Sequence, residues 1–104
     1  MQPTIGRIVH YALTQADANA INKRRADAKN LNAAGVTLAS QELGPQIHVG
    51  NHATAGDYLP AMIVATFGGP ATNLQVFLDG NDTYWATSRT EGDGPGFWTW
   101  PPRV

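Results

Sequence analysis

Three strand-like runs follow one another between residues 60 and 89, and only short turns separate them. The runs are "PAMIVATF" at 60–67, "NLQVFLD" at 73–79 and "TYWATSR" at 83–89. They are rich in β-branched and aromatic residues, which favour extended backbone. This succession predicts an antiparallel meander and restricts the chain to folds that contain a small sheet.

The connection between the second and third runs predicts the faces of that sheet. Gly80-Asn81 is a two-residue hairpin signal, because both residues tolerate the positive φ of primed turns. Such a turn places Leu78 opposite Thr83 and Val76 opposite Trp85. One face then carries the core residues Leu74, Val76, Leu78 and Trp85. The other face mixes rings with hydrogen-bonding groups, so it is either a binding surface or a subunit interface; it carries Asn73, Gln75, Phe77, Tyr84 and Ser88.

The N-terminal third predicts a strand followed by a long helix. Residues 4–12 are rich in β-branched and aromatic side chains, and Thr14 with Asp17 forms a weak capping box. The alanine-rich segment that follows has no glycine or proline before Gly35, so we expect a helix over 15–33. Its thin apolar stripe consists of Ala18, Ile21, Ala28 and Leu31.

The remaining segments are predicted as loops with short strands. We expect loops over 35–59 with a short strand near 46–49, and a last strand over 97–100. The whole pattern predicts an α+β fold of one domain, residues 1–104. It combines one main N-terminal helix with a small antiparallel sheet, arranged as a meander or partly closed.

Composition excludes several classes of function. The net charge of −1 argues against duplex nucleic acid as the main ligand, because proteins that bind the phosphate backbone are usually basic. The absence of cysteine excludes thiol catalysis and cysteine-ligated metals. No apolar run could span a membrane or serve as a secretory signal, so we expect a cytoplasmic protein. A domain of 104 residues also benefits from a partner subunit, which favours a homo-oligomer.

The predicted helix concentrates positive charge in "INKRR". Lys23, Arg24 and Arg25 cannot all face one ligand, but Asn22 and Arg25 share a face. The simpler interpretation is a solvated face that pairs with nearby aspartates. The functional interpretation is phosphate capture by the two arginines, with Asn22 beside them.

The glycine-bearing loop "VGNHATAGD" offers a second group of candidates. Gly50 would let a ligand approach the backbone, and Asn51 and His52 could donate hydrogen bonds to it. An ordinary surface turn explains the same pattern equally well. His48 and His52 have a metal-like spacing, but the residues between them indicate a loop, so no metal site is expected.

No pattern in the chain indicates an enzyme. Asp79 and Asp82 flank a tight turn, which aspartate favours for backbone reasons alone. Neither serine lies in a nucleophile elbow, and there is no glycine-rich phosphate loop. We therefore expect a protein without catalytic residues, metal or cofactor.

The C-terminal stretch "GFWTWPPRV" contains the densest cluster of rings in the chain. In a strand, Trp98 and Trp100 share one face while Phe97 points to the other, so we expect Phe97 in the core. The two tryptophans with Arg103 then form either a stacking platform for a base or a contact that seals a barrel end or a dimer.

Taken together, four stretches resemble a known family. The stretches "GRIVHYALTQADANAINKRR", "GNHATAGDYLPAMIV", "NLQVFLDGNDTYWATS" and "EGDGPGFWTWPPRV" are similar in order to small proteins of phages and prophages. We associate these proteins with the first family of Thoeris anti-defence proteins. The similarity covers nearly the whole chain.

The resemblance implies a non-catalytic sponge in the cytoplasm of an infected bacterium. Such proteins bind a cyclic ADP-ribose isomer made by TIR-domain enzymes, some also hold cyclic di- or trinucleotides, and they form dimers or trimers of dimers. By motif, the implied ligand contacts are Arg24, Arg25, Asn51, His52, Phe77, Trp98, Trp100 and Arg103. Phosphates are expected on the arginines and adenine on a ring.

Two other classes of function remain open at this point. The chain could be a small phage structural or interaction module, in which the aromatic tail is an assembly contact. It could also be a single-stranded nucleic-acid binder that stacks bases on the same rings, although its slight acidity disfavours this.

Overall fold

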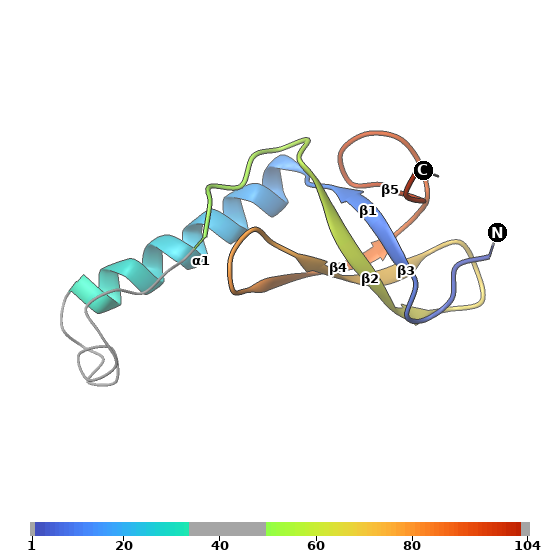
Figure 1. Cartoon of the computed structure of the whole chain (residues 1–104), viewed down its shortest axis with the longest axis horizontal. Helices are drawn as coiled ribbons and strands as arrows, with labels where there is room; N and C mark the ends of the chain where they lie inside the picture. Colours follow the sequence, from blue (N-terminus) through green and yellow to red (C-terminus); the bar gives the residue numbers. More distant parts are fainter. Residues whose placement is uncertain (1, 34–49, 103–104) are drawn as a thin grey trace.

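A computed structural model describes residues 2–33 and 50–102, with side chains omitted for residues 29–33. Five antiparallel strands form one sheet in the order β4-β3-β2-β1-β5, and one helix accompanies it in the described residues (Figure 1). The predicted α+β class is confirmed, and the sheet is not closed into a barrel. The elements in chain order are β1 (Ile8–Ala12), α1 (Gln15–Ala33), β2 (Tyr58–Thr66), β3 (Thr72–Phe77), β4 (Thr83–Arg89) and β5 (Trp98–Thr99).

The predicted meander is present as β2, β3 and β4, which are neighbours in chain order. The first strand is shorter than predicted, because Gly6 adopts a φ of 93° and turns the chain just before Ile8. The last strand is also shorter and pairs with β1 at only two positions. The strand expected near 46–49 lies outside the described residues.

The helix begins and ends where the sequence predicts. The hydroxyl of Thr14 accepts a hydrogen bond from the backbone N–H of Asp17 (2.9 Å). The carboxylate of Asp17 accepts one in return from the N–H of Thr14 (3.0 Å). This reciprocal pair is the predicted capping box, and it starts α1 at Gln15. Ala18 and Ile21 from the predicted stripe are buried.

The hairpin between β3 and β4 differs from the prediction by one residue. Phe77 lies opposite Thr83, and the connection spans residues 78–82 instead of two residues. A slip of one residue moves every side chain of one strand to the other face. Val76 therefore faces Tyr84, and Trp85, which the hairpin signal places in the core, is exposed.

The expected roles of Phe97 and Trp98 are also reversed. Trp98 is completely buried, and its indole N–H donates to the carbonyl of Arg89 (3.2 Å). Phe97 is exposed, and its ring lies over Gly92, where a Cβ atom would come within 2.7 Å of it. The prediction is wrong because it assigns the core side of β5 from residue order, whereas the pairing with β1 sets it: Trp98 lies beside buried Tyr11.

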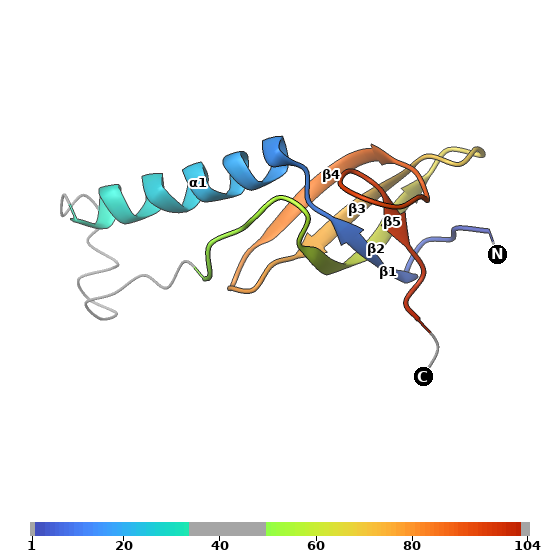
Figure 2. The same ribbon diagram turned by 90° about the horizontal axis from the view of Figure 1, so that it is seen from above.

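The sheet has one covered face and one uncovered face (Figure 2). The covered face packs with the first half of α1 and holds most of the core: Val9, Tyr11, Ala61, Ile63, Leu74, Val76 and Ala86. The positions that alternate with these form what we call the outer face. Its members include Ile8, His10, Tyr58, Pro60, Met62, Asn73, Gln75, Phe77, Thr83, Trp85 and Thr87, and Val64 lies beside them at an irregularity in the β2–β3 register.

The helix is too polar to be a membrane span. Among residues 2–33 and 50–102, the structure contains no helix that combines the length and apolar character needed to cross a bilayer.

Candidate functional site

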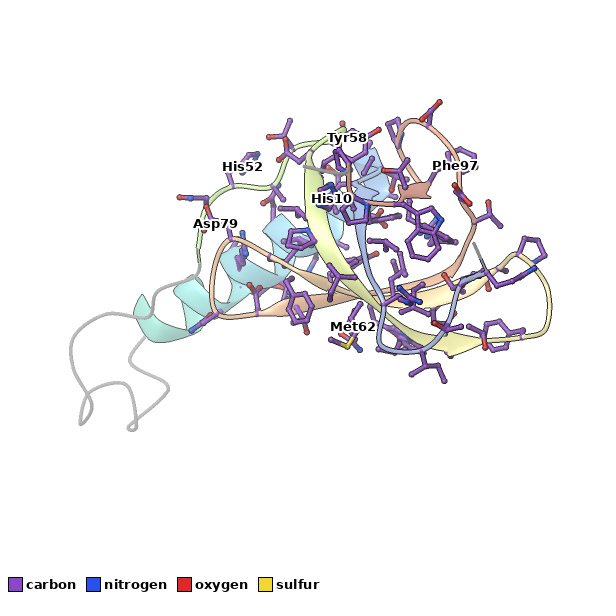
Figure 3. All side chains as sticks on the ribbon, turned by 45° about the vertical axis from the view of Figure 1, so that its right-hand side comes forward. His10, His52, Tyr58, Met62, Asp79 and Phe97 are labelled. Atoms are coloured by element: carbon purple, nitrogen blue, oxygen red, sulfur yellow. The ribbon has the colours of Figure 1, made fainter. Side chains whose placement is uncertain are left out.

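A cavity of about 310 Å³ lies where α1, the segment 50–58 and the β3–β4 turn meet. Figure 3 shows His52 and Tyr58 from the segment 50–58, and Asp79 from the β3–β4 turn, around this end of the sheet. The volume is at the lower end of the range typical of small-molecule sites. The lining residues are Arg25, Asn51, His52, Ala53, Asp57, Tyr58, Leu59, Leu78 and Asp79.

Arg25 anchors the cavity from the helix. Its side chain is only 7% exposed. Its Nε and Nη2 atoms donate to the Asp82 carboxylate at 3.2 and 2.9 Å, and Nη1 donates to the carbonyl of Asn51. One guanidinium group therefore joins α1 to both the loop and the β3–β4 turn. Such a two-point contact with a carboxylate is among the stronger hydrogen-bonded arrangements in proteins.

Two glycines make room for this guanidinium group. A Cβ atom on Gly50 would overlap the carbonyl oxygen of Asp79 and would lie 3.0 Å from Nη2 of Arg25. A Cβ atom on Gly80 would lie 3.0 Å from the same nitrogen. Gly50 also adopts a φ of 81°, which other residues rarely adopt. The loop and the turn therefore pack backbone to backbone beside Arg25.

Asp82 also binds Arg24. The Nη2 atom of Arg24 donates to the carboxylate at 2.7 Å, so two guanidinium groups share one acid. The hydrogen bonds from Arg25, followed by those from Arg24, hold the pKa of Asp82 below its ordinary value, although partial burial opposes them. Asp82 therefore occupies the positions on both arginines that the sequence-based hypothesis gives to a ligand phosphate.

Asn22 fixes the loop to the helix. Its amide nitrogen donates to the carbonyl of Ala53 (2.8 Å), and its amide oxygen accepts from the N–H of the same residue (3.0 Å). This pair satisfies a loop backbone that would otherwise be left without partners. Nδ2 of Asn22 also lies 3.4 Å from Nε2 of His52. Asn22 therefore supports the cavity wall from behind.

The cavity is rich in hydrogen-bond acceptors. The Asp79 carboxylate accepts from the side chain of Asn51, and the Asp79 carbonyl accepts from the N–H of that residue (2.9 Å). The Asp57 carboxylate accepts from the N–H of Thr54 (3.0 Å). Tyr58 lines the cavity and is 52% exposed, and its hydroxyl accepts a hydrogen bond from the N–H of Gly94 (3.4 Å). These groups suit a ligand that has a flat ring and several hydroxyl or amine donors.

The structure brings together only some of the predicted site residues. Arg25, Asn51 and His52 line the cavity, and Arg24 and Asn22 lie next to it. Phe77 lies on the outer face, and Trp98 is completely buried, so of the two interpretations of the tail the stacking platform is not available at Trp98. Trp100 is half-buried with its ring edge against Trp98 (centroids 5.2 Å apart). Arg103 lies outside the described residues.

Sequence reasoning missed the second half of the lining. It predicts a loop at Asp57, Tyr58 and Leu59, and it explains Asp79 by the turn alone. The available signal is Tyr58 itself: an aromatic residue, which favours extended backbone, stands directly between the "GD" turn residues and the apolar run, and β2 begins there. Leu78 lies on the core side, as predicted.

A buried carboxylate lies at the start of α1. Asp17 accepts from the hydroxyls of Tyr11 and Tyr84 and from Nη2 of Arg89 (3.4 Å). Its burial acts to raise its pKa. The hydrogen bonds from Tyr11, Thr14 and Tyr84 outweigh the burial and lower the pKa. Burial, together with Asp17, raises the pKa of Tyr11.

Comparison with known proteins gives no relative for this chain. No family model, curated protein or solved structure matches it. Among the described residues, no group of three His, Asp or Glu side chains is placed to hold a metal ion.

Proposed function

We propose that this protein binds and sequesters a small nucleotide second messenger without degrading it. The candidate ligand is a cyclic ADP-ribose isomer, or alternatively a cyclic oligonucleotide, and the place of action is the cytoplasm of an infected bacterium. In this role the protein is a phage immune-evasion factor. By holding the messenger, it keeps the host effector inactive.

The observation that carries the proposal is the composition of the cavity. Arg25, Asn51 and His52, three ligand candidates named from the sequence, come from α1 and from the segment 50–58 and line one space of about 310 Å³. Two of them are paired with other protein groups, which leaves the cavity rigid. A rigid cavity favours binding because little ordering is needed when the ligand enters.

The chemistry of the lining suits the nucleoside part of such a ligand. The carboxylates of Asp57 and Asp79 can accept hydrogen bonds from ribose hydroxyls or from an exocyclic amine. The exposed ring of Tyr58 provides a surface for a base to stack on. The Arg24 guanidinium, half-exposed beside Asp82, is the cation best placed to meet a phosphate outside the cavity.

The choice of messenger depends on the family resemblance. The motifs "INKRR" and "GNH", which carry that resemblance, contribute Arg25, Asn51 and His52 to the lining. The same resemblance favours a homo-oligomer as the functional form. A domain of this size with exposed apolar side chains is consistent with such assembly.

Isothermal titration with cyclic ADP-ribose isomers and cyclic di- and trinucleotides tests the proposal directly. We expect one member of the panel to bind and to be recovered intact after the protein is denatured. Tyr58→Ala should raise its Kd at least about tenfold, which corresponds to about 1.4 kcal/mol. The control Phe67→Ala, which alters an exposed ring in the turn after β2, should leave the Kd unchanged.

Three results would contradict the proposal. Failure of every panel member to bind would exclude a messenger sponge. Recovery of an altered ligand would make the protein an enzyme. Equal binding by wild type and Tyr58→Ala would move the ligand away from this cavity.

A structural or interaction module is the second candidate, and the outer face favours it. Trp85 and Phe77 are exposed there, and none of the described elements covers them. In that role no small ligand of the panel binds, while the protein still assembles through apolar surface.

A further inference from the structure

The hydrogen-bond donors that line the cavity are mostly directed to other parts of the chain. Each of the three guanidinium nitrogens of Arg25 donates to the Asp82 carboxylate or to the carbonyl of Asn51. The side-chain amide nitrogen of Asn51 donates to the Asp79 carboxylate. His52 is left as the lining side chain with a ring donor for a ligand, and it is exposed to solvent. The cavity therefore offers a ligand few donors.

The two carboxylates of the lining, by contrast, keep part of their acceptor capacity. Oδ2 of Asp57 accepts from the backbone N–H of Thr54 (3.0 Å), and Oδ2 of Asp79 accepts from the side chain of Asn51. Among the described residues, no group donates a hydrogen bond to Oδ1 of either carboxylate. The cavity therefore presents two negatively charged acceptors to a ligand.

The apolar part of the lining suits a base better than a sugar. Ala53, Leu59 and Leu78 line the cavity, and Tyr58 adds an aromatic ring. A ribose carries hydroxyl groups on several of its carbon atoms, and apolar walls would leave some of them without partners. A base has apolar faces and carries its polar groups along its edge, so its faces can contact these side chains while its edge meets the carboxylates.

The charge of the lining keeps phosphate groups out of the cavity. Arg25 is paired with Asp82, so its positive charge is matched within the protein. Asp57 and Asp79 then leave the lining with an excess of negative charge. Like charges brought together cost free energy, so a phosphate stays outside the cavity and the base is the part of the messenger that enters.

We propose that the cavity selects a base that carries an exocyclic amine, and that the carboxylates of Asp57 and Asp79 determine this specificity. The inference rests on the proposed function and deepens it, because it assigns one part of the messenger to the cavity. An exocyclic amine has two N–H groups in the plane of the ring, and both can donate to carboxylate oxygens. An oxo group at the same position would bring an acceptor against negative charge, and it is therefore rejected.

The substitution Asp79→Asn should change this preference without removing the side chain. Because Asn51 donates to Oδ2 of Asp79, the oxygen of the new amide can keep that hydrogen bond. Its amide nitrogen then takes the position of Oδ1 and presents N–H groups to the ligand, which suit an oxo group. Asp57→Asn makes the same exchange beside the N–H of Thr54.

Isothermal titration with three matched ligands tests the proposal. The first is the adenine-containing member of the messenger panel that binds. The second has hydrogen in place of the exocyclic amine, and the third has an oxo group there. We expect the wild type to bind both analogues at least about fivefold more weakly than the first ligand. In Asp79→Asn, the preference for the amine over the oxo group should fall at least about fivefold.

A matched substitution elsewhere separates recognition of the base from general charge effects. Glu91→Gln also replaces a carboxylate by an amide, at an exposed position that follows β4 and does not line the cavity. It should leave the Kd of all three ligands unchanged. Circular dichroism of all variants checks that each one remains folded.

Several outcomes would overturn the inference and leave the proposed function standing. The wild type could bind the three ligands with equal Kd, or the preference for the amine could persist unchanged in both Asp57→Asn and Asp79→Asn. A messenger that binds and has no exocyclic amine on any base would have the same consequence. Failure of every member of the panel to bind is a different result, because it removes the proposed function and this inference together.

Discussion

Two carboxylates, one at the start of α1 and one in the β3–β4 turn, bind arginine in different surroundings. Asp17 is buried and accepts mainly from the hydroxyls of Tyr11 and Tyr84. Asp82 is 25% exposed and accepts from the guanidinium groups of Arg24 and Arg25. The first therefore stabilises the junction of helix and sheet, while the second holds together the elements around the cavity.

The difference shows how burial changes the role of the same side chain. At Asp17 the loss of hydration is the largest influence on the pKa, and several neutral donors compensate for it. At Asp82 the hydrogen bonds from Arg25 are the largest influence on the pKa. Replacing the carboxylate should accordingly cost much more stability at the first site than at the second.

The largest effect is expected from Asp17→Asn. The change removes a buried charge that accepts from Thr14, Tyr11, Tyr84 and Arg89, and it leaves the Arg89 cation without this ion-pair partner. We expect the free energy of unfolding to fall by about 3 kcal/mol. Urea unfolding followed by circular dichroism measures this loss. Tyr84→Phe, which removes one donor only, should cost about 1 kcal/mol; equal losses would contradict a central role for the carboxylate.

A smaller effect is expected from Gly50→Ala, measured against Gly56→Ala. Both glycines have positive φ (81° and 90°), but of the two only Gly50 has backbone atoms within 3 Å of the position that a methyl group would take. Strain alone should cost each variant about 1 kcal/mol. The contact with Asp79 should raise the cost at Gly50 to about 2 kcal/mol and should weaken messenger binding. Equal stability of the two variants would show that the loop moves away from the turn without cost.

The smallest effect is expected from Asp82→Asn, and it should depend on pH. A partly exposed ion pair contributes up to about 1 kcal/mol at neutral pH. Because the arginines lower the pKa of Asp82 in the folded state, this stability is present above the ordinary value of 3.8 and is lost as the pH falls through the lowered pKa. The stability difference between wild type and variant should therefore shrink on acidification. Urea midpoints between neutral pH and about pH 2 measure it, and a constant difference would contradict the assignment.

Local signals are sufficient to predict most of the elements. The capping residues Thr14 and Asp17 and the uninterrupted helix-forming segment mark the limits of α1. Residue composition locates β3 and β4 to within two residues at either end. The start of a helix and the position of a strand depend mainly on residues that are close together in the sequence, so both can be predicted from it.

The faces of the sheet could not be predicted in the same way. Gly80-Asn81 is a good signal for a two-residue turn. In the structure, however, the connection extends from 78 to 82, and within it the Asp82 carboxylate binds Arg24 and Arg25. The register with this connection places Trp85 opposite Gln75 and turns it outward. Pairing with β1 likewise decides that Trp98, and not Phe97, enters the core.

The candidate site could be predicted only in part, for the same reason. Arg25, Asn51 and His52 are recognisable because charge and loop-forming residues stand out in the sequence. Tyr58 and Leu59 are not, because their position depends on where β2 meets the segment 50–58. The pairing of both arginines with Asp82 involves a separation of nearly sixty residues, which no local pattern reveals.

The position of β5 affects the order in which the protein can fold during synthesis. Strand β1 is made first among the described strands, yet its neighbours in the sheet are β2 and β5, which follow much later in the chain. Trp98, which has the largest fully buried side chain, belongs to the strand that is made after all the others. A nascent chain that ends before residue 98 therefore exposes the edge of β1 and an incomplete core. Translational pausing before that point should favour aggregation or capture by a chaperone.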